Sequence, residues 1–76
     1  MTTIYKIKNL SKSFDAHVGA AFFGKKKLEQ YINKFLKEYG LSGEICKDNN
    51  IYAWSRVPGK LGKYIIGKVE VININL

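Results

Sequence analysis

The sequence has little of the chemistry from which catalytic and metal sites are built. Among its 76 residues there is one cysteine, Cys46, and one histidine, His17, and no nucleophile motif surrounds either of them. One cysteine cannot form an intrachain disulfide, and one cysteine with one histidine cannot complete a tetrahedral zinc site. We therefore expect a non-enzymatic protein with no catalytic residue, no cofactor and no metal, whose thiol suits a reducing compartment.

Long apolar runs and nucleotide-binding motifs are also missing. The longest apolar stretch, Val18 to Phe23, is far below the roughly 20 residues of a membrane span. The first residues lack the apolar segment of a signal peptide, and the glycines match neither the P-loop nor the dinucleotide fingerprint. We expect a single soluble domain over residues 1–76, with no membrane partner, in the cytoplasm, or in the host cytoplasm if a phage encodes it.

Acidic residues are scarce as well. The chain has 13 lysines and arginines against 6 acidic residues, which gives a formal net charge of +7. Because the lysines are spread over several segments, this charge favours nucleic acid, a nucleoprotein complex or an acidic protein surface as the partner. Arg56 is the only arginine, and bidentate reading of guanine is mainly arginine chemistry, so we do not expect sequence-specific base recognition.

Hydrophobic periodicity predicts two strands and one helix in the first part of the chain. Residues Thr3 to Asn9 alternate as a half-buried strand does, Leu10 to His17 read as a connection, and Val18 to Phe23 read as a second short strand. From Lys25 to Tyr39 the apolar residues recur with a helical period, which predicts an amphipathic helix of about four turns. Five polar positions of this helix are expected to lie outside: Glu29, Asn33, Lys34, Lys37 and Glu38.

Glycines and further strands delimit the rest. Gly24 can act as the helix N-cap and Gly40 as its left-handed C-cap. A short strand is expected near Glu44 to Lys47, a longer one at Ile51 to Val57, and a last one at Tyr64 to Leu76. The result is an α+β domain, an antiparallel β-sheet of about four strands in the order β-β-α-β-β with one amphipathic α-helix packed on one face.

Two local sequence features of the last hairpin predict details of its structure. Pro58-Gly59 fits the centre of a type II turn. The apolar residues of the last strand change parity, which indicates either a bulge near Val71-Ile72 or a strand that serves two environments.

Three consecutive lysines, Lys25, Lys26 and Lys27, stand at the predicted helix start. A helix N-terminus carries partial positive charge and favours acidic residues, so these lysines run against the helix dipole. They can form an anion site with the free N–H groups of the first turn, or they can be solvated side chains that keep the protein in solution. Both interpretations stay open.

Tyr52, Trp54 and Arg56 share one face of a predicted strand. Such a face could stack the bases of single-stranded nucleic acid beside a cation. We instead expect Tyr52 and Trp54 to face the core beneath the helix, because so small a domain needs its only tryptophan for core area. If the opposite face of the strand met the helix, the aromatic platform would be exposed.

Further lysines could extend a basic surface. Lys60 and Lys63 lie in the predicted hairpin loop close to Arg56, and Lys6 and Lys8 make the outer face of the first strand basic. Together with the helix start they could form one contiguous surface for phosphates, although hairpin loops are commonly basic without being sites.

The passage from Val18 to Ile32 runs from a strand ending in Phe22-Phe23 into the lysine-rich helix start. It resembles a pattern in small bacterial and phage accessory proteins, in which a later strand closes the sheet. In size and architecture the chain is also similar to small phage-encoded inhibitors of host defence, including some anti-CRISPR proteins. This resemblance implies a protein partner, and it assigns no role to any residue of the chain.

Two functional hypotheses follow. The first is a basic, non-enzymatic protein that docks on nucleic acid or on a nucleoprotein complex through its lysine-rich face. The second is a phage-type, anti-defence inhibitor that binds a host protein through the aromatic and basic patch around Tyr52, Trp54 and the Lys60 to Lys63 loop. Homodimerisation through an exposed edge strand, such as Asn73 to Leu76, is a further possibility.

Overall fold

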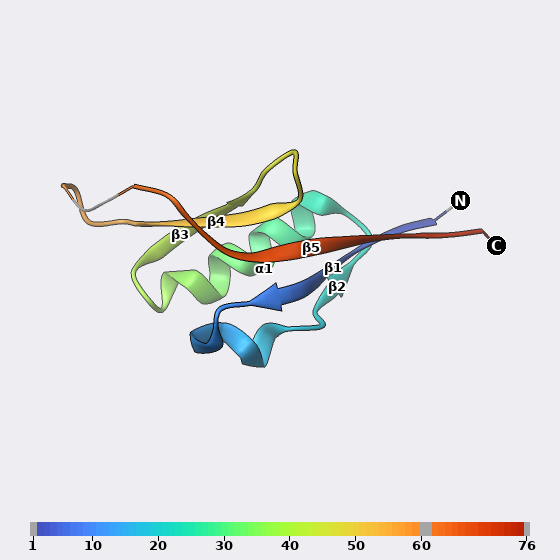
Figure 1. The fold of residues 1–76 in the computed structure, drawn as a ribbon, viewed down its shortest axis with the longest axis horizontal. Coiled ribbons are helices and arrows are strands. Elements are labelled where there is room, and N and C mark those ends of the chain that lie inside the picture. The colour runs from blue at the N-terminus through green and yellow to red at the C-terminus, as the bar shows by residue number, and fades with distance from the viewer. Residues whose placement is uncertain (1, 60–61, 76) are drawn as a thin grey trace.

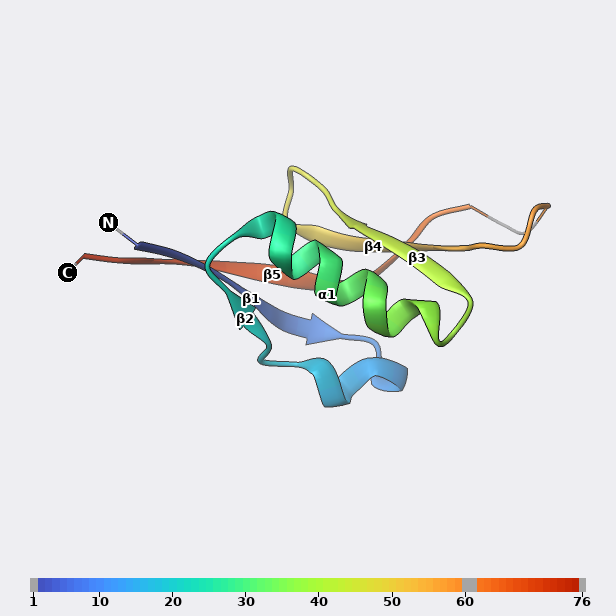
Figure 2. The same cartoon turned by 180° about the vertical axis from the view of Figure 1, so that it is seen from behind.

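The chain forms a curled, five-stranded antiparallel sheet with one helix on one face, as seen in a computed structural model that describes residues 2–59 and 62–75 (Figure 1). In spatial order the strands are β2-β1-β5-β4-β3. Their bounds, with those of the helix α1 and the 3-10 helix η1, are β1 Thr2–Leu10, η1 Lys12–His17, β2 Ala21–Phe22, α1 Lys25–Lys37, β3 Leu41–Ile45, β4 Asn50–Ser55 and β5 Tyr64–Ile74. Seen from behind, α1 lies across the near face of the sheet (Figure 2).

The predicted α+β class and the single amphipathic helix are confirmed. The helix begins at Lys25 with Gly24 as its N-cap, and it ends at Lys37, slightly before the predicted end at Tyr39. Gly40 follows with a φ of 72°, the left-handed conformation expected of it. Gly59 has a φ of 84°, as the second central residue of a type II turn requires.

The sheet has five strands where about four were expected. The strand predicted near Glu44 to Lys47 is β3, which starts earlier and ends at Ile45. It ends there because a tight turn follows, in which the Asn49 N–H donates to the Cys46 carbonyl. The order is therefore β-β-α-β-β-β.

Three predicted boundaries were wrong. Residues Lys12 to His17 were expected to be a plain connection, but they form η1, because Phe14 is buried against the aromatic rings of Phe35 and Tyr39. The second strand is only Ala21–Phe22, since the chain turns before it at Gly19, whose φ is 94°.

The third boundary is the end of β4. This strand stops at Ser55 and not at Val57, because the Val57 N–H donates to the Ser55 side chain instead of to a neighbouring strand.

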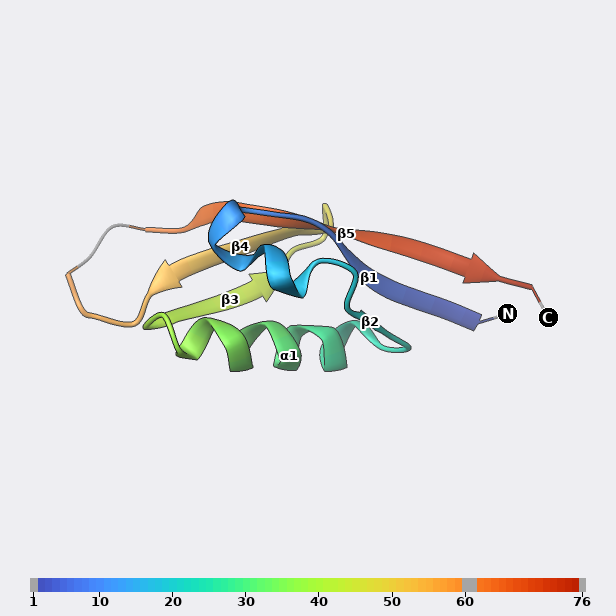
Figure 3. The same ribbon diagram turned by 90° about the horizontal axis from the view of Figure 1, so that it is seen from below.

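The parity change in β5 has a different origin from a bulge at Val71-Ile72. Those two residues pair without interruption with Tyr5 and Ile4 of β1, so the bulge prediction was wrong there. The register shifts instead where β5 meets β4, between Ile51 and Tyr52. The alternative prediction, a strand in two environments, fits: beyond β4 and α1, the end of β5 pairs only with β1 as a two-stranded ribbon (Figure 3).

The hydrophobic core lies entirely between α1 and one face of the sheet. Residues from both layers and from η1 meet there: Ile7, Phe14, Leu28, Ile32, Phe35, Leu36, Ile45, Ile51, Ala53, Ile66 and Val69. The apolar area buried at this one interface has to offset the conformational entropy that the chain loses on folding, because so small a domain has no second core.

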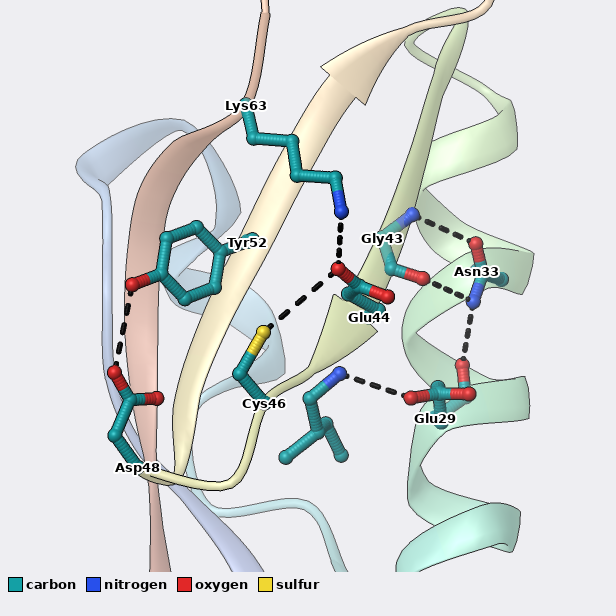
Figure 4. A network of polar contacts seen from close by, with 9 residues as sticks. Glu29, Asn33, Gly43, Glu44, Cys46, Asp48, Tyr52 and Lys63 are labelled. Atoms are coloured by element: carbon teal, nitrogen blue, oxygen red, sulfur yellow. Dashed lines mark hydrogen bonds and ion pairs between the residues drawn. The ribbon is translucent and has the colours of Figure 1, made fainter.

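Polar side chains of α1 hold the helix against the outer edge of β3 (Figure 4). The Asn33 amide donates to the Gly43 carbonyl and accepts from the Gly43 N–H, both at 2.8 Å. Glu29 accepts the Ile45 N–H at 2.9 Å. Asn33 and Glu29 were predicted to lie outside, and both are half-buried, because they pair with backbone groups that an edge strand leaves unpaired.

The contact between α1 and β3 is close because Gly43 has no side chain. A Cβ at this position would lie 2.6 Å from the Leu36 side chain and 3.2 Å from that of Ile32. The absence of a Cβ therefore allows Asn33 to reach the strand as a neighbouring backbone would.

Replacing Asn33 by alanine should lower the free energy of unfolding by about 2 kcal/mol, because both Gly43 backbone groups lose their partner in a partly buried place. Urea titration followed by circular dichroism measures this loss. The neighbouring exposed lysine gives the control, and Lys34→Ala should change stability by less than about 0.5 kcal/mol. Equal effects of the two variants would contradict the role assigned to Asn33.

Gly67 is the other position that needs the smallest residue. A Cβ there would lie 1.9 Å from the Asn9 carbonyl oxygen and 2.7 Å from the Leu10 side chain, at the place where β1 is irregular. We expect Gly67→Ala to destabilise the fold by about 2 kcal/mol or more, since backbone must move. Gly62→Ala is the matched control, because no atom lies within 4 Å of the place that a Cβ of residue 62 would take. In thermal unfolding, the melting temperature of Gly62→Ala should stay near that of the parent chain.

Candidate functional site

One face of the sheet is not covered by another helix or strand among the residues described (Figure 3). We call it the open face. Successive side chains of a strand point to opposite faces of the sheet. The residues that alternate with those buried against α1 therefore point to the open face. They are Thr2, Ile4, Lys6, Lys8, Ser42, Glu44, Tyr52, Trp54, Ile65, Lys68, Glu70, Ile72 and Ile74.

Tyr52 and Trp54 lie side by side along β4 on the open face. Their neighbours Ile51 and Ala53 have 0% exposure and pack toward α1, so the expectation that Tyr52 and Trp54 form the core was wrong. Isoleucines, the leucines of α1 and the phenylalanines of α1 and η1 form most of the core instead. Both open-face rings are half-buried, and each leaves part of its surface to solvent.

A lysine lies over the Trp54 ring and is paired with a glutamate of β3; we call these charged side chains the polar frame. The Lys63 ammonium lies 5.1 Å from the ring centroid, within the range of a cation–π contact, and it pairs with the Glu44 carboxylate (Figure 4). Glu44 itself stands directly opposite Tyr52 on the neighbouring strand. The hydrogen bond between the two side chains lowers the pKa of Glu44 and raises the pKa of Lys63, so both stay charged at neutral pH.

The turn between β3 and β4 completes this polar frame. The Tyr52 hydroxyl donates to Asp48 at 3.4 Å, and the backbone N–H of Asn50 donates to the same carboxylate, which lowers the pKa of Asp48. Desolvation, with the nearby Glu44 charge as the next cause, raises the pKa of the Cys46 thiol. Cys46 is therefore protonated at neutral pH and poorly nucleophilic.

The remaining open face carries more positive than negative charge. Its strands carry three lysines, at 6, 8 and 68, and Lys63 reaches it from the segment before β5, against two glutamates, at 44 and 70. Lys6 stands opposite Glu70, whereas Lys68 stands between Asn9 and Asn50 with no acidic neighbour across either strand. Lys68 and Lys8 thus offer cations to an anionic partner without displacing an acid opposite them.

Of the three helix-start lysines, Lys25 lies near the polar frame, whereas Lys26 and Lys27 lie in a different part of the molecule. Lys25 is half-buried and its ammonium donates to the Cys46 carbonyl at 3.3 Å, while Lys26 and Lys27 are exposed beside Phe23, whose exposure is 75%. This end of α1 lies away from the β4–β5 hairpin (Figure 3). Lys25 therefore lies near the Glu44–Lys63 pair, but Lys26 and Lys27 do not join Lys63 in one contiguous basic surface.

The other predicted site residues lie at the hairpin. Arg56 is exposed just after β4, and its Nε donates to the Leu41 carbonyl at 3.0 Å. Lys63 precedes β5 and reaches back to Trp54. Lys60 lies outside the described residues.

Sequence reasoning missed Glu44, Ile65 and Lys68 as parts of the candidate surface. Ile65 and Val69 have the same parity in the sequence, yet the register shift where β5 meets β4 places Ile65 opposite Tyr52 while Val69 faces the core. Only the pairing partners reveal this, because a one-residue irregularity reverses the face of every position before it.

The described residues contain no group of three or more His, Cys, Asp or Glu side chains arranged to hold a metal ion. Cys46 and His17 do not meet: Cys46 contacts Glu44, whereas His17 stacks on Phe35 at 4.0 Å and shares a hydrogen bond with the Tyr31 hydroxyl. In the same part of the chain, no helix has the length and apolar character needed to cross a membrane.

The Lys63–Glu44 pair gives a titration that can be followed. Removing the lysine charge with Lys63→Met should raise the Glu44 pKa toward its usual value, since the hydrogen bond from Lys63 is the main cause of the lowering. Because the folded-state pKa is lowered, the pair stabilises the fold at neutral pH, and this contribution is lost as the pH falls through the lowered value. Carboxyl NMR shifts of Glu44 measure the change directly.

Lys68→Met is the control for that titration, because it removes a lysine from the same face that has no bond to Glu44. The Glu44 titration should be nearly that of the parent chain in this variant. If Lys63→Met also left it unchanged, the ion pair would be absent in solution.

Comparisons of the chain with protein-family models, with curated proteins and with solved structures found no match. No relative therefore supplies a role for any residue. The features that bear on function are those of the open face itself: its two aromatic rings, its cations and its hydrogen-bonded frame.

Proposed function

We propose that the chain is a non-enzymatic binding protein whose open face takes up single-stranded nucleic acid without sequence specificity. The observation that supports this most is the pair of adjacent rings, Tyr52 and Trp54, on a sheet face that no helix covers among the described residues. Bases of any identity stack on aromatic rings, and each stacked base contributes about 1–3 kcal/mol. Two rings in a row on one strand can receive two successive bases.

The positions of the two rings suit stacking because they are partly fixed before a ligand arrives. Tyr52 is tied through its hydroxyl to Asp48, and the Lys63 ammonium lies over the ring of Trp54. Rings held in this way lose little rotamer entropy on binding.

Lysines beside the rings can bind the phosphates of the same strand. Lys68 lies on β5, next to the strand that bears the rings, and Lys8 and Lys6 follow on β1. A backbone that crosses from β4 toward β1 would pass these ammonium groups in turn. Attraction between such cations and phosphates needs no base contact, in keeping with the single arginine of the chain.

A second candidate function uses the same surface for a protein. Ile65 lies opposite Tyr52 with 52% exposure, and an apolar side chain between aromatic rings and a cation is the composition of an interface hot spot. The partner would then be an acidic or nucleic-acid-binding protein surface, such as a component of a host defence complex that an anti-defence inhibitor blocks.

Binding of a labelled oligo-deoxythymidylate, followed by fluorescence anisotropy, tests the first proposal. We expect Trp54→Ala to weaken binding on the order of ten-fold or more, because one stacked base is lost. Tyr64→Ala is the matched aromatic control: Tyr64 stands opposite the buried Ala53, on the other side of the sheet, so its loss should leave the affinity nearly unchanged.

A salt series adds a second, independent readout. For single strands the slope of log K against log salt changes by about 0.7 for each phosphate contact, so Lys68→Gln should reduce the slope by roughly that amount. Lys34→Gln, an exposed lysine on α1, should leave the slope as it is. The pair Lys26→Glu and Lys27→Glu tests the helix start, and a large loss there would move the site away from the open face.

Absence of binding at low salt, or equal affinities of the parent chain and Trp54→Ala, would overturn the nucleic-acid proposal. In that case capture from a nuclease-treated host lysate distinguishes the second function. A protein retained by the parent chain and lost with Trp54→Ala would support it, and no such protein would exclude it.

A further inference from the structure

The outer edge of β3 and the end of β5 differ in whether other groups of the chain pair with their backbone. On β3, Asn33 and Glu29 of α1 take up the groups that point outward. On β5, the residues from Glu70 to Ile74 pair with β1 on one side, and within the described residues no strand or side chain pairs with the backbone on their other side. We call this the free edge of β5.

The hydrogen bonds around the ribbon show which groups the free edge presents. The Val69 N–H points away from β1, because it donates to the Asn49 carbonyl at 2.8 Å on the β4 side. In an antiparallel pair the backbone groups of successive residues point to alternate sides. Val71 and Asn73 therefore direct their N–H and C=O groups outward, whereas Ile72 directs its own toward β1.

We propose that the free edge of β5 pairs with the same edge of a second copy of this chain, antiparallel and across a two-fold axis at Ile72. This proposal is independent of the proposed function. The pairing sets Val71 opposite Asn73 of the second copy and Asn73 opposite its Val71, so that all four outward groups of each copy find a partner. Such an isologous contact closes on itself as a dimer.

The charges along the edge suit a second copy in this orientation. From Val71 to Ile74 there is no charged residue, and the only charge at the free edge is Glu70 at one end. Antiparallel pairing places the two copies of Glu70 about 13 Å apart along the strands, beyond the screening length at physiological salt. Parallel pairing would instead set like charges side by side.

Apolar side chains strengthen the same contact. Ile4, Ile72 and Ile74 form a half-buried apolar cluster on the open face of the ribbon. In the dimer, Ile72 meets its own copy at the axis, and the two clusters join. The free edge also lacks the proline, bulge or inward charge that natural sheets use to prevent such pairing.

The interface is small, since five residues of each copy pair. Interfaces below about 1,200 Å² belong to weak and transient complexes, so the dimer should form at high micromolar to millimolar concentration. The two-fold axis runs through the sheet, which leaves both open faces on the same side of the dimer.

Sedimentation equilibrium over a concentration series tests the proposal. The mass of the parent chain should rise from the monomer value of 8.7 kDa toward twice that value. Asn73→Pro removes an outward N–H without removing a bond to β1, and it should stay monomeric at every concentration. Thr3→Pro is the matched control: it removes an outward N–H from the β1 edge and loses the same Thr3–Asn73 side-chain hydrogen bond, yet it should dimerise like the parent chain.

Amide hydrogen exchange gives a second readout that needs no variant. The Val71 and Asn73 amides should become more protected as concentration rises, whereas the Thr3 amide should exchange at the same rate throughout. A monomeric mass of the parent chain at every concentration overturns the proposal. So does an Asn73→Pro variant that dimerises normally, a Thr3→Pro variant that is equally monomeric, or protection of Thr3 in place of Val71 and Asn73.

Discussion

The rest of the structure depends on the paired hydrogen bonds between the Asn33 amide and the Gly43 backbone. They bring α1 so close to β3 that only glycine fits beneath it, and they satisfy an edge that would otherwise attract another strand. With the helix fixed there, the small residue Ala53 faces it and the bulky Tyr52 and Trp54 face away. The surface that we propose for binding is thus a consequence of how the helix is attached.

The fold class could be predicted because its main signals are local. The apolar period from Lys25 onward, bounded by Gly24 and Gly40, defines the helix without knowledge of any other segment. The roles of Asn33 and Glu29 could not be predicted in this way. A polar side chain on a helix looks solvent-exposed in sequence, and only the position of β3 shows that its partner is a backbone.

The candidate site was predictable in its residues but not in its orientation. Tyr52 and Trp54 were recognised as a shared strand face, yet both faces of β4 carry apolar side chains, so parity could not say which one is buried. The position of Ile65 could not be predicted, because the register shift where β5 meets β4 reverses the alternation between Ile65 and the buried Val69. The separation of Lys26 and Lys27 from Lys63 is a property of the tertiary structure alone.

The strand order has a consequence for how the chain acquires its structure. β5 is the last strand in sequence and lies in the middle of the sheet, where it joins β1 to β4. The β3–β4 pair and α1 can form early, because their segments are neighbours in the sequence. In contrast, β1 pairs with a strand about 70 residues away, as the Thr3–Asn73 contact shows. Such distant pairing makes folding slow, and on the ribosome the sheet can close only once β5 has emerged from the exit tunnel.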